Sequence, residues 1–188
     1  MHRKARLFWP IVFGWLALDI VTKRLAVAQL GSPGTPHEVL GSLVRLTLTF
    51  NQGAALGMSL GKWSRPAFTA LALAMLGLLA HFYRTTSPRD RRRAVVLAFI
   101  TAGAIGNLID RLRWSRGVVD FIDIGIGPVR WWTFNLADMG ITLGAIALAF
   151  ILGQRDAPPA EAEQSARSRA SVVSPRRPGD DHRGRRHS

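Results

Sequence analysis

The stretch of sequence that decides the fold is Phe134-Asn-Leu-Ala-Asp138, which opens an otherwise apolar run from Met139 to Leu152. A second aspartate precedes it closely, in Gly117-Val-Val-Asp120-Phe121. A carboxylate at the edge of a membrane's hydrocarbon core is costly unless it has a partner or a function. Two of them beside one apolar run indicate a carboxylate pair that can share a single proton, which is the chemistry of an aspartic peptidase.

The run at residues 134–152 is one of four apolar stretches that approach the roughly 20 residues needed to cross a bilayer as a helix. The other three cover about residues 7–25, 66–83 and 94–112. We therefore predict an α-helical integral membrane protein with four transmembrane helices. Apolar clusters are scarce after Gly153, so we expect residues 1–153 to form the membrane domain and residues 154–188 a disordered, basic cytoplasmic tail.

Basic residues gather in three segments that four spans would place on one side of the membrane. These segments are the N-terminus, the loop between the second and third apolar stretches, and the tail. The positive-inside rule places all three in the cytoplasm, and the loops at about residues 29–65 and 113–133 outside. A net charge of +13 distributed in this way fits anionic lipid better than nucleic acid, which we do not expect as a partner.

The N-terminus also resembles a secretory signal peptide, with a basic start, an apolar run and Ala26-Val-Ala28. Three charged residues crowd the segment before that cleavage position: Asp19, Lys23 and Arg24. Cleavage would also leave three spans and place the basic loop and the tail on opposite sides. We therefore expect the first span to be retained.

The two outer loops differ in character. In the first, residues 43–50 alternate apolar and polar side chains at several positions and are rich in residue types that favour strands. In the second, Trp131-Trp132 fits the aromatic belt found at membrane interfaces. We expect a strand in the first loop and an interfacial contact in the second.

The polar residues in or next to the apolar stretches converge on the outer side. They are Asp19, Lys23, Asn51, Asn107, Asp110, Arg111, Asp120, Asn135 and Asp138. A proton-coupled transporter, the first alternative function, would distribute such groups across the membrane with access from both faces. The second alternative is a structural or lipid-binding membrane protein in which the aspartates only cap helices and form ion pairs.

Several of these residues also have a plain structural interpretation. Asp19 and Lys23 are four residues apart on one helical face and can form an ion pair. Asp138 can cap the helix that it begins. Asp123 competes with Asp120 for a place in the carboxylate pair, and spacing does not separate the two.

Other catalytic chemistries have little support in the sequence. There is no cysteine, which excludes disulfides, thiolate nucleophiles and thiolate metal sites. His37 is the only histidine expected on the outer side, so no Ser-His-Asp set or zinc site is supported, and Ser59 and Ser64 near Lys62 make a weak Ser-Lys dyad. We expect neither a metal nor a cofactor.

Five blocks of residues, in this order, resemble the lipoprotein signal peptidases, or signal peptidase II, which are bacterial aspartic peptidases of the inner membrane. The blocks are Asp19-x-x-Thr22-Lys23, Asn51-x-Gly53-Ala54-Ala55-x-Gly57, Gly106-Asn107-x-x-Asp110-Arg111, Val119-Asp120-Phe121 and Phe134-Asn135-x-Ala137-Asp138. Each block is weak alone, but five in order on four spans make a specific signal.

The resemblance implies a fold and a set of site residues. The fold would be four transmembrane helices with a small extracytoplasmic β-sheet cradle. Asp120 and Asp138 would be the catalytic pair, which sets Asp123 aside. The other matched polar and small residues would support the site or contact the substrate, namely Asp19, Lys23, Asn51, Gly53, Asn107, Asp110, Arg111 and Asn135.

The activity implied by the resemblance is removal of the signal peptide from prolipoproteins that carry a diacylglyceryl group. Cleavage would fall just before the lipidated cysteine, by a water molecule that the two aspartates activate. We expect a monomer in the bacterial inner membrane with both termini in the cytoplasm and the active site at the extracytoplasmic face. Its expected partners are the lipid-modified prolipoprotein and membrane lipids.

Overall fold

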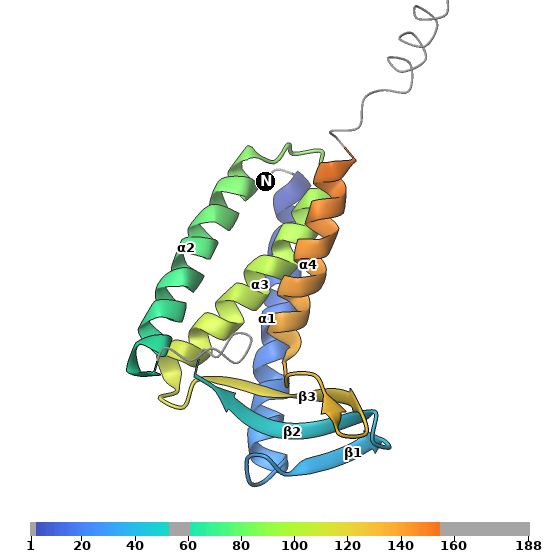
Figure 1. Cartoon of the computed structure of the whole chain (residues 1–188). Helices are drawn as coiled ribbons and strands as arrows, with labels where there is room; N and C mark the ends of the chain where they lie inside the picture. The colour runs from blue at the N-terminus through green and yellow to red at the C-terminus, as the bar shows by residue number, and fades with distance from the viewer. Residues whose placement is uncertain (1–2, 53–60, 155–188) are drawn as a thin grey trace, which may run out of the picture. The chain divides into compact units, whose positions relative to one another are not determined.

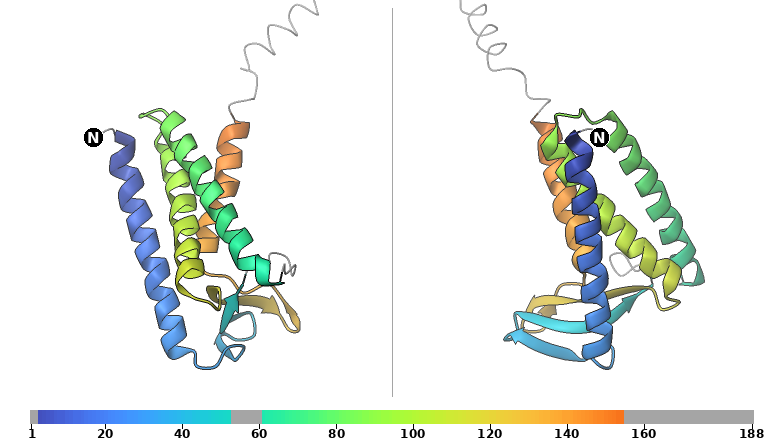
Figure 2. Two further views of the ribbon diagram at one scale, coloured as in Figure 1. Left: turned by 90° about the vertical axis from the view of Figure 1, so that its left-hand side faces the viewer. Right: turned by 180° about the vertical axis from the view of Figure 1, so that it is seen from behind.

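The computed structural model describes residues 3–52 and 61–154, which fold into four α-helices and a four-stranded sheet (Figure 1). The helices are α1 (Arg3–Gln29), α2 (Ser64–Thr85), α3 (Arg91–Arg113) and α4 (Leu136–Gly153), and a 3-10 turn, η1 (Gly61–Trp63), precedes α2. Two further views show the sheet lying across one end of the helices (Figure 2). Each predicted apolar stretch therefore lies within a helix or covers most of one.

Three of the described helices, α2, α3 and α4, are long and apolar enough to cross a membrane. α1 is not among them, so the first of the four predicted spans stays a prediction, although a continuous helix covers it. In α3, 56% of the apolar window is buried inside the protein, against 6% in α2. α3 is therefore the central helix, and α2 presents most of its surface outward.

Small residues let α4 approach α3 closely. A side chain at Gly103 of α3 would overlap the backbone oxygen of Ala137, and one at Gly144 of α4 would overlap the side chain of Ile100. Such contacts are the usual means of close helix packing in membranes. Gly103 and Gly144 therefore belong to the contact face between α3 and α4.

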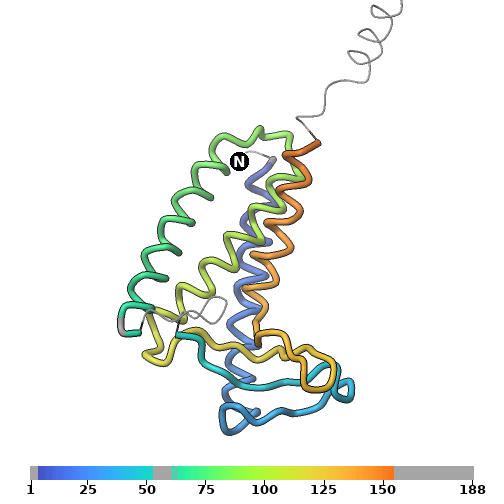
Figure 3. Tube along the Cα trace, in the orientation of Figure 1, coloured from blue at the N-terminus to red at the C-terminus, as the bar shows by residue number. Residues whose placement is uncertain are grey.

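The core between α1, α2 and α3 is apolar and lies toward the end of the helices away from the sheet. Phe8 and Val12 of α1 pack there with Leu79 of α2 and Leu97 of α3. At the same end, the Lys4 ammonium donates hydrogen bonds of 2.6 Å to the backbone oxygens of Tyr83, near the end of α2, and Thr86, just after it. The chain trace shows that the start of α1 and the connection from α2 to α3 share one end, while the sheet occupies the other (Figure 3).

The sheet is antiparallel throughout and has the order β1 (Pro36–Leu40), β2 (Val44–Asn51), β3 (Val118–Ile126) and β4 (Val129–Arg130). β2 confirms the strand predicted over residues 43–50. In the central pairing, Thr49 of β2 lies opposite Asp120 of β3. The sheet thus joins the two outer loops into one layer.

Asp120 falls within residues 113–133, the predicted second outer loop, but it lies in a strand that was not predicted there. It lies in the first half of β3, where residues 118–121 are all buried. A strand that is covered on both faces shows no alternation of apolar and polar side chains, which is the pattern that revealed β2. The sequence of β3 therefore gives little indication that it forms a strand.

Candidate active site

The site is centred on Asp120 and Asp138, which Asn135 joins. The Asn135 side-chain nitrogen donates a hydrogen bond of 2.7 Å to Oδ1 of Asp120. Its backbone nitrogen donates to Oδ2 of Asp138 at 3.2 Å, and its side-chain oxygen accepts from the Asp138 backbone nitrogen at 2.9 Å. Two aspartates from different elements, a strand and a helix, thus share one asparagine.

The contact between Asn135 and Asp138 is also the start of α4. Asn135 immediately precedes the helix, and the two residues exchange side-chain and backbone hydrogen bonds in the manner of a capping box. The structural interpretation of Asp138 as a cap is therefore correct. Only one carboxylate oxygen of Asp138 takes part in the cap, so the other oxygen can form further hydrogen bonds.

Asn107 of α3 completes the amide network. Its side-chain nitrogen donates a 2.7 Å hydrogen bond to the other oxygen of Asp138. Its side-chain oxygen accepts from the side chain of Asn135 at 3.2 Å and from Lys23 at 3.1 Å. α3 and the start of α4 are fixed to each other at the sheet end by this residue.

Asp120 is only 2% exposed. Burial, and after it the charge of Asp138, raises the pKa of Asp120 from an ordinary 3.8 to about 7. Hydrogen bonds from Asn51 and Asn135 act in the opposite direction. At neutral pH this carboxyl group therefore exists in both its protonated and its ionised forms, as a group that exchanges protons must.

A second cluster of charges lies beside the first. The ammonium of Lys23 is 2.8 Å from Asp19 and 2.9 Å from Asp110, and all three side chains are buried. Asp19 accepts a 2.9 Å hydrogen bond from the backbone of Ala137, and Asp110 accepts one of 3.2 Å from the backbone of Val119. Each of these aspartates therefore holds the residue that immediately precedes Asp138 or Asp120.

An apolar groove leads to Asp138 between α2, α3 and α4. Its volume is about 220 Å³, and its walls include Phe68, Leu71 and Met75 of α2 and Ile141 of α4. The polar residues that line it are Asn107, Arg111 and Asp138. A long apolar group in this groove would bring its polar end to the carboxylate.

Comparisons with known proteins identify the family of this chain. Residues 11–153 match the family described as signal peptidase (SPase) II. The lipoprotein signal peptidase of Paraburkholderia phymatum is 37% identical over 145 residues, which cover 72% of this chain and 85% of the relative. That of Burkholderia thailandensis is 35% identical over 144 residues, with the same coverage. The chain belongs to the signal peptidase II family.

Solved structures support the same placement. Two solved structures, each described as a bacterial membrane enzyme structure obtained by the in meso method, are similar to this chain, with TM-scores of 0.68 and 0.66 at 32% identity. They match 77% and 76% of this chain and 85% and 89% of their own lengths. The resemblance to signal peptidase II in five short blocks is therefore confirmed at the level of the family.

The structure separates Asp120 from its rival Asp123. Asp123 is paired with Arg130 at 2.9 Å and accepts a 3.1 Å hydrogen bond from Thr47. Residues an odd number of positions apart in a regular strand face opposite sides of the sheet, so Asp120 and Asp123 diverge. The signal that distinguishes them is strand periodicity, which requires β3 to be recognised first.

The other predicted site residues of the signal peptidase II fall into two groups. Asn51 hydrogen-bonds Asp120, and Asn107 and Asn135 lie in the network described above. Arg111 lines the groove and donates to the backbone oxygen of Asn107 at 3.1 Å. Gly53, with Ala54, Ala55 and Gly57 of the same block, lies outside the described residues, as do residues 155–188 of the predicted tail.

Two residues near the site were not singled out from the sequence as site residues. A side chain at Gly106 would overlap the carboxylate of Asp19, so this position requires glycine. The ring nitrogen of Trp15 donates a 3.1 Å hydrogen bond to the backbone of Leu136, at the start of α4. Trp15 and Leu136 are too far apart in the sequence for any local pattern to connect them.

Proposed function

We propose that this signal peptidase II removes the signal peptide from prolipoproteins that carry a diacylglyceryl-cysteine, cutting just before that cysteine. The observation that carries the proposal is the pair of linked acids: Asp138 lines an apolar groove, and Asn135 joins it to the buried Asp120. The groove suits an apolar signal helix or acyl chain. Asp138 is one of the polar residues that line the groove, so a substrate held there by its apolar part would present its peptide bond to the acids.

The proposed reaction is hydrolysis by an aspartate pair. Each aspartate accepts two N–H hydrogen bonds, but only Asp120 is buried, and burial favours its protonated form. In this scheme Asp138 takes a proton from water, and the resulting hydroxide attacks the scissile carbonyl carbon. Asp120 donates its proton to the carbonyl oxygen.

The intermediate then collapses, with breakage of the C–N bond. The proton that Asp138 holds passes to the leaving amine, and Asp120 recovers its own proton from the intermediate. The amides of Asn107 and Asn135 orient the two carboxyl groups throughout. The two acids thus exchange their protonation states and return to the starting state, with one water consumed.

The proposed topology makes α1 a fourth span. α1 packs along α3, which is itself apolar and long enough to cross a membrane. With α1 spanning, the basic segments at Arg3–Arg6 and Arg89–Arg93 share the cytoplasmic side of the inner membrane, and the sheet and the two acids face outward. We propose a monomer, with residues 1–153 as the peptidase domain and residues 154–188 as a solvated cytoplasmic tail.

A cleavage assay tests the function. Purified full-length protein is mixed with a precursor that carries the diacylglyceryl group and, separately, with the same precursor without it, and the product is identified by mass spectrometry. We expect a new N-terminus at the lipidated cysteine. The lipidated precursor should be cleaved at least tenfold more efficiently, which corresponds to a free-energy difference of about 1.4 kcal/mol. Equal cleavage of both precursors, or cleavage at another bond, would contradict the proposal.

A further inference from the structure

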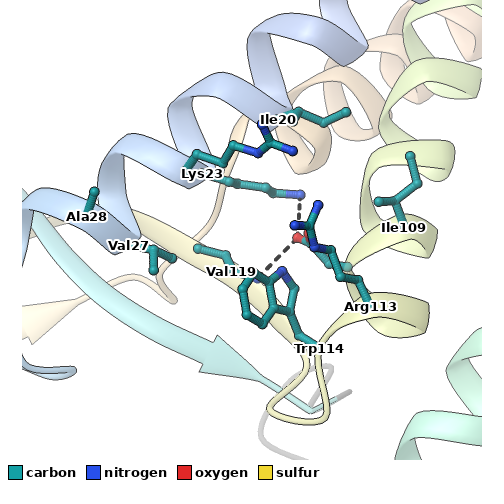
Figure 4. A pocket seen from close by; sticks show the side chains of 10 residues that line it. Ile20, Lys23, Val27, Ala28, Ile109, Arg113, Trp114 and Val119 are labelled. Atoms are coloured by element: carbon teal, nitrogen blue, oxygen red, sulfur yellow. Dashed lines mark hydrogen bonds and ion pairs between the residues drawn. The ribbon is translucent and has the colours of Figure 1, made fainter.

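A second cavity lies on the other face of α3, away from the groove that leads to Asp138. It has a volume of about 300 Å³ and opens between α1 and α3 where they approach the sheet (Figure 4). It shares no lining residue with the groove between α2, α3 and α4. The mechanism proposed above therefore does not use this space.

The two helices present matching pairs of residues to this cavity. α1 contributes Ile20 and, one turn nearer the sheet, Arg24; α3 contributes Ile109 and, one turn nearer the sheet, Arg113. In Figure 4, Ile20 and Ile109 lie across the opening from each other. Each helix thus offers an apolar side chain toward the membrane and a guanidinium at the interface.

The two arginines have no acidic partner in the part of the chain that the structure describes. Both are exposed, and neither forms an ion pair there, whereas Lys23 at the base of the cavity is already paired with Asp110. Arg113 lies 5.4 Å from the ring of Trp114, an aromatic residue suited to the interface. Three cations and one acid line the cavity, which leaves a positive excess at its mouth.

We propose that this cavity binds an anionic phospholipid of the outer leaflet. Its phosphate would lie between Arg24 and Arg113, whose planar groups suit phosphate oxygens. Its first acyl carbons would contact Ile20 and Ile109. Because 300 Å³ is small, the headgroup region enters the cavity and the acyl tails lie along the outside of α1 and α3. The charge excess selects an anionic lipid over a zwitterionic one.

The test is a binding measurement that does not depend on peptidase activity. The full-length protein in detergent is titrated with dioleoyl-phosphatidylglycerol and, in parallel, with dioleoyl-phosphatidylcholine and with inorganic phosphate, and bound lipid is counted by native mass spectrometry. We expect phosphatidylglycerol to bind on the order of tenfold more tightly than phosphatidylcholine. Its headgroup has a net negative charge that both arginines attract, whereas the phosphatidylcholine headgroup has no net charge.

Two variants locate the binding. The double variant Arg24→Gln/Arg113→Gln should lose this preference, while Arg84→Gln/Arg116→Gln, which removes the same charge from exposed arginines that do not line the cavity, should keep it. Ala28→Trp, which fills the cavity from an exposed position and leaves both arginines in place, should also abolish the tight binding.

Three results would overturn the proposal. The first is an unchanged preference in Arg24→Gln/Arg113→Gln or in Ala28→Trp. The second is an equal loss in the control variant, which would reduce the effect to net charge. The third is binding of inorganic phosphate as tight as that of phosphatidylglycerol, which would make free phosphate the occupant.

Discussion

Two pairs of aspartates lie side by side at the sheet end of the helices, and they are treated in opposite ways. Asp19 and Asp110 share the ammonium of Lys23, at 2.8 and 2.9 Å. Asp120 and Asp138 have no such ion pair in the described part of the chain and are linked through amide side chains instead. The first pair surrounds a buried cation, whereas the second has neutral amide partners, and a charged carboxylate disfavours ionisation of its neighbour.

The two pairs are also connected. Asp19 accepts a hydrogen bond from the backbone of Ala137 and Asp110 from that of Val119, so each charge-paired acid contacts the residue before Asp138 or Asp120. The first pair therefore positions the second. Substitutions should separate the two roles, since one pair would be needed for structure and the other for chemistry.

The largest expected effect is on activity. Asp120→Asn and Asp138→Asn should each lower the cleavage rate of a lipidated precursor by at least roughly 10³-fold, because either change removes a proton donor or acceptor from the reacting pair. Asp123→Asn is the matched control, as its carboxylate is engaged by Arg130 away from the pair, and it should lose less than about tenfold. Turnover near that of the wild type in Asp120→Asn or Asp138→Asn would contradict the proposed mechanism.

The next effect should fall on stability. Lys23→Met removes the shared cation and leaves Asp19 and Asp110 buried without compensation, which should cost about 3–5 kcal/mol and lower the thermal unfolding temperature. The triple variant Asp19→Asn/Lys23→Met/Asp110→Asn, which removes all three charges, should recover part of the loss. If Lys23→Met unfolded at the temperature of the wild type, the structural role of the cation would be wrong.

The pH dependence of stability should distinguish the pairs in a third way. The pKa of Asp120 is raised to about 7 in the folded protein from 3.8, so the unfolded chain ionises first as the pH rises. The contribution of Asp120 to stability is therefore full below about pH 4 and is lost up to about pH 7, by at most about 1.4 kcal/mol per pH unit. The free energy of unfolding should therefore change less with pH over this range in Asp120→Asn than in the wild type. The same pH dependence in both proteins would refute the raised pKa.

The smallest effect concerns the packing around the charge-paired acids. Gly106→Ala places a methyl group against the Asp19 carboxylate and should cost about 1–3 kcal/mol. Gly14→Ala and Gly77→Ala are controls in helices with open space around them, where alanine should be neutral or favourable. A Gly106→Ala variant as stable as these controls would show that α1 can shift to relieve the contact.

The sequence predicted the elements whose signals are local. The apolar stretches located the helices, alternation located β2, and the four-residue spacing predicted the pair of Asp19 and Lys23, which the structure confirms at 2.8 Å. The third member, Asp110, could not be assigned to that pair, because its contact with Lys23 depends on how α1 packs on α3. The family resemblance was needed to prefer Asp120, since β3 is buried on both faces and its periodicity is hidden.

The hydrogen bonds that begin α4 have a kinetic consequence. Because Asn135 and Asp138 cap the helix and also form the site, opening of its first turn would separate the two acids. Such opening must also break the hydrogen bonds from Ala137 to Asp19 and from Trp15 to Leu136, yet it requires less free energy than global unfolding. Heat should therefore lower activity before the protein unfolds, and the fall in activity should parallel the fall in amide-exchange protection at Ala137 and Asp138.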